Sequence, residues 1–181
     1  NASGRMENGK LSVDLLVEKD YNNAITAAKH IDEYNEQRRD IDKQMTDEAN
    51  GIVEKLESQR HRSSIVLYDE NWKKGVIGIV ASRLTEIYFR PTVVLTRDGQ
   101  FATGSARSVA GFDVYSAIKS CRDLLINFGG HTYACGLTIR WEDVPEFSKR
   151  FYKYVEEHIE PTQTEATLTV DAVIDFRDIS R

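Results

Sequence analysis

The fold is decided by residues 63–108, which read SSIVLYDENWKKGVIGIVASRLTEIYFRPTVVLTRDGQFATGSARS. Ile65–Tyr68 is a short apolar run typical of a buried strand, and Gly75–Phe89 has the length and apolar spacing of a helix. Pro91–Leu95 is a second buried strand, and after a turn the chain forms a strand over Phe101–Ser108. Strands and a helix in this order predict an α/β domain with helices packed on a sheet.

The same alternation continues towards the C-terminus. We expect a helix over Val114–Leu125, a strand over Ala134–Trp141 and a helix over Pro145–Ile159. A polar linker follows Pro161, and Thr167–Ile174 has the pattern of one further strand. The α/β unit should therefore end near residue 159, with the beginning of another unit after it.

A long helix is predicted before the α/β unit, with Asp20 as its N-cap. Apolar or small side chains recur at gaps near three and four, at Tyr21, Ala24, Ala28, Ile31, Tyr34, Ile41, Met45, Ala49, Ile52 and Leu56. Arg38 stands where an apolar side chain is expected. A helix of roughly 35–40 residues would span on the order of 50–60 Å and typically bridges domains. A coiled-coil dimer arm is the alternative. Before it, Asn1–Arg5 reads as a small-residue loop.

Composition indicates a globular protein without a membrane span. Of 181 residues, 40% are hydrophobic and 29% charged, and no run approaches the ~20 apolar residues that cross a bilayer. The two cysteines, Cys121 and Cys135, form no metal or disulfide pattern, which favours a reducing, cytoplasmic setting. The net charge is −5, but residues 63–140 hold nine basic and six acidic side chains. This local excess suggests one surface that faces an anion.

Three short motifs could bind an anion. Ser105 and Arg107 are two residues apart on a predicted strand, so both should face the same side and offer a hydroxyl beside a guanidinium. A surface arginine paired with a neighbouring acid is an equally good interpretation. Lys73 and Lys74 precede Gly75 at a helix start, where free backbone amides also favour anions, although such lysines are often merely solvated.

The third motif, Phe128-Gly129-Gly130-His131, is predicted to be a loop after a helix. Its glycines would let the backbone approach a ligand, and His131 would present a hydrogen-bonding group at the tip. The alternative is a glycine helix cap followed by a hydrogen-bonded core histidine. His30, His61, His131 and His158 are scattered, and no cluster of Asp and His has metal-ligand spacing. The chain alone is therefore not expected to hold a metal or to be catalytic.

Four motifs in order resemble the RecJ-type exonucleases of the DHH phosphoesterase superfamily. They are Asn1–Met6, Gly75–Leu84, Gly104–Ser108 and Gly129–His131, and the resemblance covers essentially the whole chain. It implies the end of a catalytic domain at 1–19, a connecting helix at 20–62, a DHH-associated domain at 63–159 and the start of an OB-like domain at 160–181. The implied fold is a long bridging helix followed by a mixed sheet with helices packed on it.

The resemblance also implies a function for the full-length protein. It would degrade single-stranded DNA from 5′ to 3′ in recombination and repair, using Mn²⁺ or Mg²⁺ held by an N-terminal domain that this chain lacks. The residues implied to bind nucleic-acid phosphate are Arg5, Lys73, Lys74, Ser105, Arg107, Gly129, Gly130 and His131, with an assisting role for His131. No membrane is involved, and no protein partner is implied.

One position departs from the family pattern. Family members usually carry a histidine two residues before the glycine matched by Gly75, where this chain has Lys73. A lysine binds phosphate but is not a proton shuttle near neutral pH. Two alternative functions are another DHH phosphoesterase acting on short oligonucleotides or cyclic dinucleotides, and a non-catalytic accessory module like that of alanyl-tRNA synthetase. The long helix and the OB-like start speak against the first, and the Gly104–Ser108 and Asn1–Met6 motifs speak against the second.

Overall fold

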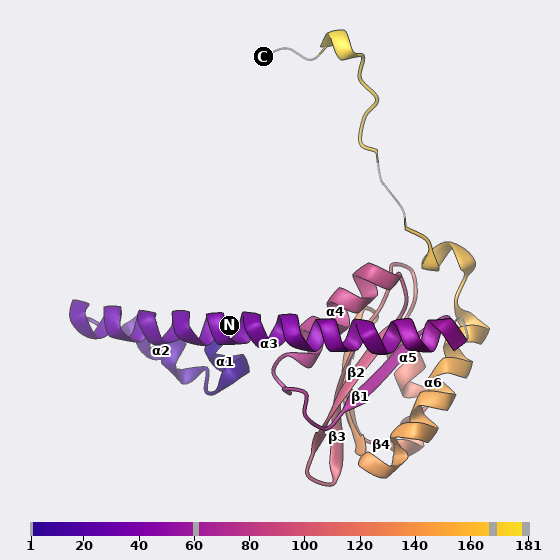
Figure 1. The fold of residues 1–181 in the computed structure, drawn as a ribbon, viewed down its shortest axis with the longest axis horizontal. Helices are drawn as coiled ribbons and strands as arrows, with labels where there is room; N and C mark the ends of the chain where they lie inside the picture. Colours follow the sequence, from indigo (N-terminus) through magenta and orange to yellow (C-terminus); the bar gives the residue numbers. More distant parts are fainter. Residues whose placement is uncertain (1, 60–61, 167–169, 179–181) are drawn as a thin grey trace.

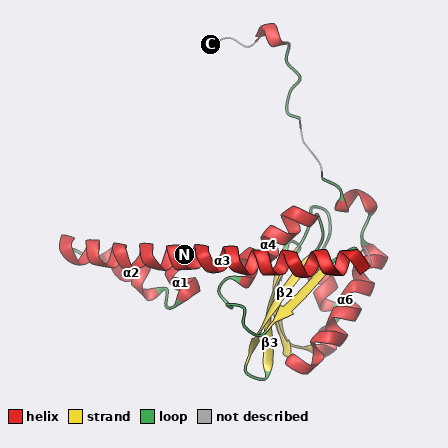
Figure 2. Cartoon of the chain, in the orientation of Figure 1, coloured by secondary structure: helices red, strands yellow, loops and turns green. Residues whose placement is uncertain are grey.

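The computed structural model describes residues 2–59, 62–166 and 170–178. A three-layered α/β body lies at one end of a long helix, and two short helices lie along the other end (Figures 1 and 2). The α-helices are α1 (Ala2–Met6), α2 (Lys10–Val17), α3 (Tyr21–Gln59), α4 (Ile77–Tyr88), α5 (Val114–Lys119) and α6 (Val144–His158). The strands are β1 (Ile65–Asp69), β2 (Thr92–Asp98), β3 (Phe101–Arg107), β4 (Leu125–His131) and β5 (Ala134–Arg140).

The five strands form one mixed sheet in the order β1-β2-β3-β5-β4. Only β1 and β2 are parallel, because α4 connects them as a crossover helix, whereas the other neighbours are antiparallel. The α/β class and the mixed sheet predicted from the sequence are confirmed.

Each face of the sheet has its own hydrophobic core. On one face, Ile65, Leu67 and Val94 pack against α3 and α4. On the other, α5 and α6 bury a larger cluster that includes Phe147 and Phe151, both fully buried. Helices α5 and α6 cover this second face across the whole sheet. On the first face, α3 and α4 cover the strands only as far as β3. The α4 side of β5 and β4 therefore remains open.

The predicted long helix is present as α3, 39 residues without interruption. The Asp20 side chain accepts a hydrogen bond from the Asn23 N–H at 2.9 Å, as its predicted role of N-cap requires. Arg38, which interrupts the apolar stripe, has a polar partner: it donates to Asp42, a carboxylate only 2% exposed. Asp42 also accepts from Arg83 of α4 at 2.9 Å, so the polar position fastens α3 to the body.

Three predicted elements were wrong. Asn1–Arg5 was expected as a loop, but residues 2–5 belong to helix α1, because Ala2 and Ser3 are buried against the other N-terminal helices. The helix expected over Val114–Leu125 ends at Lys119 and is followed by a short 3₁₀ turn. Gly129–His131, expected as a loop after a helix, is the end of strand β4, which pairs with β5 in a hairpin.

The last described residues run away from the body (Figure 1). Part of the predicted strand Thr167–Ile174, residues 167–169, lies outside the described residues. Residues 170–175 form no strand, and Val173 is 96% exposed. The OB-like ending and the division of the chain at residues 19, 62 and 159 stay predictions.

Candidate anion-binding site

Ser105 and Arg107 lie on the same face of β3, as their spacing predicts, and they contact each other. Arg107 Nη1 donates to Ser105 Oγ at 2.9 Å and to the Ala106 carbonyl at 2.8 Å, while Nε donates to Ser82 Oγ of α4 at 3.1 Å. All three acceptors are neutral. The guanidinium is thus held in one orientation by groups that do not neutralise its charge.

A second cation lies next to Arg107. Arg5, at the end of α1, donates from Nη1 to the Gly75 carbonyl at 3.1 Å. Partial burial, followed by the positive charge of Arg5, lowers the pKa of Arg107 from its ordinary value. In the described part of the chain neither arginine forms a salt bridge, so the interpretation of Arg107 as paired with an acid is not supported. Two neighbouring guanidiniums without a carboxylate favour binding of an external anion.

Two glycines let the elements that carry these side chains pack closely. A Cβ on Gly75 would lie 1.9 Å from the Arg5 carbonyl oxygen, so only glycine lets α1 pack here. A Cβ on Gly78 would lie 3.1 Å from Ser105 Oγ and 3.3 Å from Arg107 Nη2, closer than ordinary packing allows. The glycines of the Gly75–Leu84 motif therefore bring α1 and α4 onto the end of β3.

The Gly129–His131 motif lies on the same side of the sheet, two strands away. The register pairs Arg107 with Ala134 and Ala134 with His131, so all three side chains project from one face. Two strand spacings place His131 about 10 Å from Arg107 along the row. His131 is exposed and its Nδ1 accepts from the Tyr133 N–H at 3.3 Å. The alternative of a buried core histidine is therefore wrong.

The two predicted lysines are placed differently from the arginines. Lys74 forms a salt bridge with Asp98 at 2.8 Å, and both side chains are exposed. The structure does not join Lys74 to the Arg5–Arg107 pair. Lys73 is exposed at the start of α4, where its carbonyl accepts from the N–H groups of Val76 and Ile77.

The structure adds two residues that sequence reasoning did not single out. Ser82 fixes Arg107, and it lies one helical turn after Gly78 within a motif already recognised. Gly136 pairs with both Ser105 and Gly129. It therefore lies at the centre of a second row of paired residues, next to the row that contains Arg107. Ser82 could have been suspected from its motif, but Gly136 becomes visible only through the register of β5.

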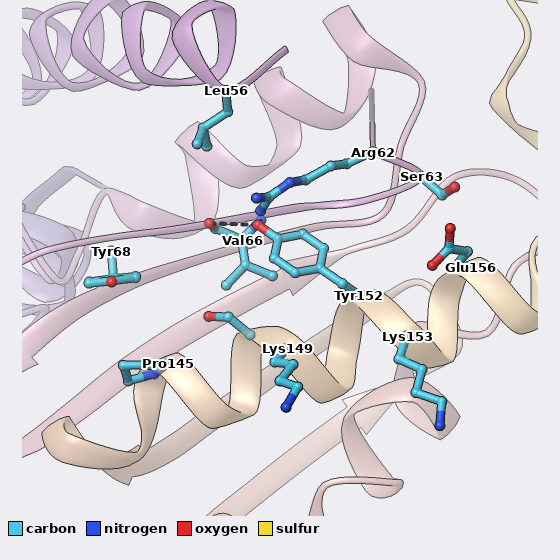
Figure 3. A pocket seen from close by; sticks show the side chains of 11 residues that line it. Leu56, Arg62, Ser63, Val66, Tyr68, Pro145, Lys149, Tyr152, Lys153 and Glu156 are labelled. Atoms are coloured by element: carbon cyan, nitrogen blue, oxygen red, sulfur yellow. Dashed lines mark hydrogen bonds between the residues drawn. The ribbon is translucent and has the colours of Figure 1, made fainter. Parts of the chain in front are cut away.

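A large cavity lies at the other edge of the sheet. It is an open pocket of about 540 Å³ between the end of α3, β1 and α6. Figure 3 shows Tyr152 facing Val66, and the Tyr152 hydroxyl hydrogen-bonds both the N–H and the carbonyl of Val66, at 3.1 and 3.2 Å. Arg62 lies over the Tyr152 ring, 4.6 Å from its centre. None of the predicted site residues line this cavity, so its size alone does not make it the functional site.

The described residues also lack two features. They contain no group of three His, Cys, Asp or Glu side chains that could hold a metal ion. Among the helices in the described ranges, none is both long and apolar enough to cross a membrane.

Comparison with known proteins identifies relatives of this arrangement. The family model of the DHHA1 domain matches residues 46–157. A Bacillus subtilis protein, single-stranded-DNA-specific exonuclease RecJ, is 37% identical over 99% of this chain and 23% of its own length. The protein of the same name from Dickeya dadantii is 34% identical over 94% of this chain and 31% of its own length. The chain thus spans 23% and 31% of the length of these two relatives.

Solved structures of RecJ proteins also match the fold of this chain. The crystal structure of RecJ in complex with Mg²⁺ from Thermus thermophilus matches with a TM-score of 0.76 at 29% identity, covering 89% of this chain and 25% of that one. A structure of exonuclease RecJ bound to manganese also matches with a TM-score of 0.76, at 28% identity, covering 92% of this chain and 41% of that one. The long helix and the sheet are therefore shared with RecJ structures.

Proposed function

This chain belongs to the DHHA1 domain family and resembles RecJ exonucleases over nearly its whole length, and from that premise we propose that it is the substrate-binding part of a single-strand-specific DNA exonuclease. Its task is to hold the phosphate backbone of single-stranded DNA. The complete protein would degrade that strand from 5′ to 3′ in recombination and repair. The two cysteines, free and buried, suit the cytoplasmic setting that we propose for it.

The observation that carries the proposal is the arginine pair. Arg107 has neutral hydrogen-bond partners and a cationic neighbour, Arg5, and no carboxylate of the described residues pairs with either. A phosphate diester supplies the negative charge and the acceptor oxygens that both guanidiniums lack. Ser105 and the exposed His131 offer further hydrogen bonds on the same face.

Hydrolysis of the phosphodiester needs a metal centre that we assign to another part of the protein. RecJ structures contain Mg²⁺ or Mn²⁺, but the described residues here form no cluster that fits such an ion. The contribution of this chain is to orient the substrate strand and to neutralise its charge, both of which lower the barrier for a reaction elsewhere.

The test is DNA binding by Arg107→Ala. If Arg107 contacts a phosphate, the variant loses a charge-assisted hydrogen bond of about 1.5–3 kcal/mol, roughly ten- to a hundredfold in affinity for a single-stranded oligonucleotide. Its melting temperature should hardly change, because Arg107 has no ion pair to lose. Arg39→Ala is the matched control, since Arg39 is an exposed arginine on α3 far from β3 along the chain.

The opposite pattern would contradict the proposal. A large drop in melting temperature, with unchanged affinity per folded molecule, would mean that Arg107 is a structural residue. Competition by duplex DNA or by a cyclic dinucleotide distinguishes the substrate class, because a single-strand-specific site should prefer the oligonucleotide.

A further inference from the structure

Strand β1 forms one edge of the sheet, and part of that edge has no partner. Ile65 donates its N–H to the Pro91 carbonyl at 2.9 Å, so the odd-numbered residues of β1 direct their backbone groups towards β2. Val66 and Tyr68 direct theirs outward. The hydroxyl of Tyr152 on α6 bonds to both groups of Val66, the N–H at 3.1 Å and the carbonyl at 3.2 Å. Within the described ranges, no side chain and no backbone group beyond the sheet bonds to the N–H or carbonyl of Tyr68.

The open position lacks the usual protection of an edge strand. Such strands are shielded by proline, by charged side chains, by a bulge or by a covering segment. Tyr68 is uncharged and 46% exposed, and it packs edge-on against Trp141 with ring centres 5.9 Å apart. Tyr152 covers the edge at Val66 and leaves it open two residues later. An unpaired N–H and carbonyl at a sheet edge are the groups to which an extended peptide adds as a further strand.

An open pocket borders this edge and has two different walls (Figure 3). One wall is a stripe of α6, whose members recur every three or four residues: Pro145, Ser148, Lys149, Tyr152, Lys153 and Glu156. The other wall is the end of α3, where Leu56 packs against the core on the opposite face of the sheet. Successive side chains of a strand point to opposite faces. A peptide paired with β1 would therefore turn alternate side chains towards α6 and towards Leu56.

The wall formed by α6 is cationic. In the described part of the chain, Arg62, Lys149 and Lys153 line the pocket with one carboxylate, Glu156. Arg62 lies over an aromatic ring, and neither Arg62 nor Lys149 forms a salt bridge among the described residues. Lys153 has an exposed acidic partner one turn away, at 3.8 Å. The positive charge favours acidic side chains on the half of the peptide that faces α6, whereas Leu56 favours apolar side chains on the other half.

We propose that the β1 edge and this pocket bind an extended segment of a partner protein in which acidic and apolar residues alternate. The backbone of the segment pairs with Tyr68, its acidic side chains face Arg62 and Lys149, and its apolar side chains contact Leu56. Arg107 lies two strands away, on the other face of the sheet, where it contacts α4. A bound partner therefore leaves the arginine pair open, and the inference does not rest on the proposed function.

The first experiment tests the charge. The probe is an eight-residue peptide of alternating glutamate and valine, blocked at both ends, fluorescently labelled and titrated with the 181-residue chain. Arg62→Ala combined with Lys149→Ala should weaken its binding by about tenfold or more, because both charge-assisted contacts are lost. Arg39→Ala combined with Lys43→Ala, two exposed positions on α3, is the matched control and should bind like the wild type. A peptide of alternating lysine and valine should not bind.

The second experiment tests the backbone pairing. The N–H groups of a strand alternate between its two edges, so methylating the amide nitrogens of all glutamates, or of all valines, blocks one edge in each case. One of these two peptides should bind about tenfold more weakly, and the other should bind like the unmodified peptide. On the protein, Tyr68→Pro removes the outward N–H, a change that an edge strand tolerates. Tyr68→Ala removes the same ring but keeps the N–H, so it should bind the peptide more tightly than Tyr68→Pro.

The outcomes separate this inference from the proposed function. Arg107→Ala should bind the peptide like the wild type, whatever its affinity for DNA. A glutamate–valine peptide that does not bind at millimolar concentrations would overturn the inference, and so would equal affinities of the two methylated peptides. Displacement of the peptide by a single-stranded oligothymidylate, with weaker DNA binding by the Arg62 and Lys149 double variant, would make the pocket part of the DNA site and would also overturn it.

Discussion

Arg83 and Arg107 carry the same guanidinium in opposite surroundings. Arg83 donates to the carboxylate of Asp42, so its charge is balanced inside the protein. Arg107 donates to two hydroxyls and a carbonyl, and burial together with Arg5 lowers its pKa. The surroundings of Arg107 therefore oppose its charge until an anion binds, which is the physical reason for assigning it to a ligand.

Arg107 predicts how the affinity for single-stranded DNA depends on salt concentration. Each phosphate contact with single-stranded DNA contributes about 0.7 to the slope of log affinity against log salt concentration. Arg107→Ala should flatten that slope by about 0.7, whereas a variant that merely loosens the fold should shift the line without changing its slope. Titrations at several salt concentrations measure it, and an unchanged slope would remove the phosphate contact from the proposal.

The Asp113 carboxylate predicts that the stability of the fold depends on pH. Its side chain caps α5 and accepts from the Ser116 hydroxyl and N–H, and these hydrogen bonds lower the pKa of the carboxyl despite partial desolvation. Because the folded pKa is depressed, the stabilisation is complete above the unfolded value of about 3.9 and is lost as the pH falls below it.

Two substitutions at Asp113 separate the cap from the charge. Asp113→Ala should lower stability by about 1 kcal/mol at pH 7, or roughly 2–4 °C in melting temperature. Asp113→Asn should keep most of the cap at pH 7 and lose the acid dependence. Thermal melts between pH 7 and pH 3 decide this; a wild type and an Asn variant with parallel profiles would refute the assignment.

Single residues also mark the limit of sequence reasoning. Ser105 and Arg107 could be paired in advance because the period of a strand is two. Ser82 reaches the same site from α4 within a recognised motif, whereas Gly136 reaches it from β5 through a register that no local pattern contains.

Among the elements, α3 was predictable and β4 was not. The stripe on α3 repeats over many turns, and Asp20 and Asp42 explain where it begins and why Arg38 interrupts it. Strand β4 has one partner strand and two glycines near its end, so its apolar alternation is short and resembles the end of a helix. Pairing with β5 decides its conformation, and that is a tertiary effect.

Asp42 gives a prediction at the scale of elements. It accepts from Arg38 at 3.3 Å and from Arg83 at 2.9 Å, linking α3 to α4. Asp42→Ala should cost about 1.5–3 kcal/mol, the range for a charge-assisted hydrogen bond, and lower the melting temperature by several degrees. Asp40→Ala, an exposed neighbour on the same helix, is the control. Equal melting temperatures for both variants would show that the link contributes nothing.

For the whole molecule, we expect binding without catalysis. No described group of side chains could hold a metal ion, although RecJ structures contain Mg²⁺ or Mn²⁺. The purified 181-residue chain, incubated with labelled single-stranded DNA and Mn²⁺, should leave the DNA intact. Digestion that is sensitive to EDTA and follows the protein through purification would disprove this.

The first half of α3 extends beyond the α/β body and would move as a rigid rod if the helix tilted. Asp42 hydrogen-bonds Arg83 and so links the second half of α3 to the α/β body, while α1 and α2 pack along the first half (Figure 1). From Asp42 the first half of α3 (the arm) extends about 32 Å, so a tilt of about 5° that loosened the contact between Arg5 and Gly75 would move its tip by about 3 Å. Arg5 travels with the arm and Arg107 stays with the body. Repulsion between the two cations would push the arm outward, and a phosphate between them would draw it in. We expect labels on Leu16 and Ile87, both exposed, to approach each other when DNA binds; an unchanged separation would mean that the arm is fixed.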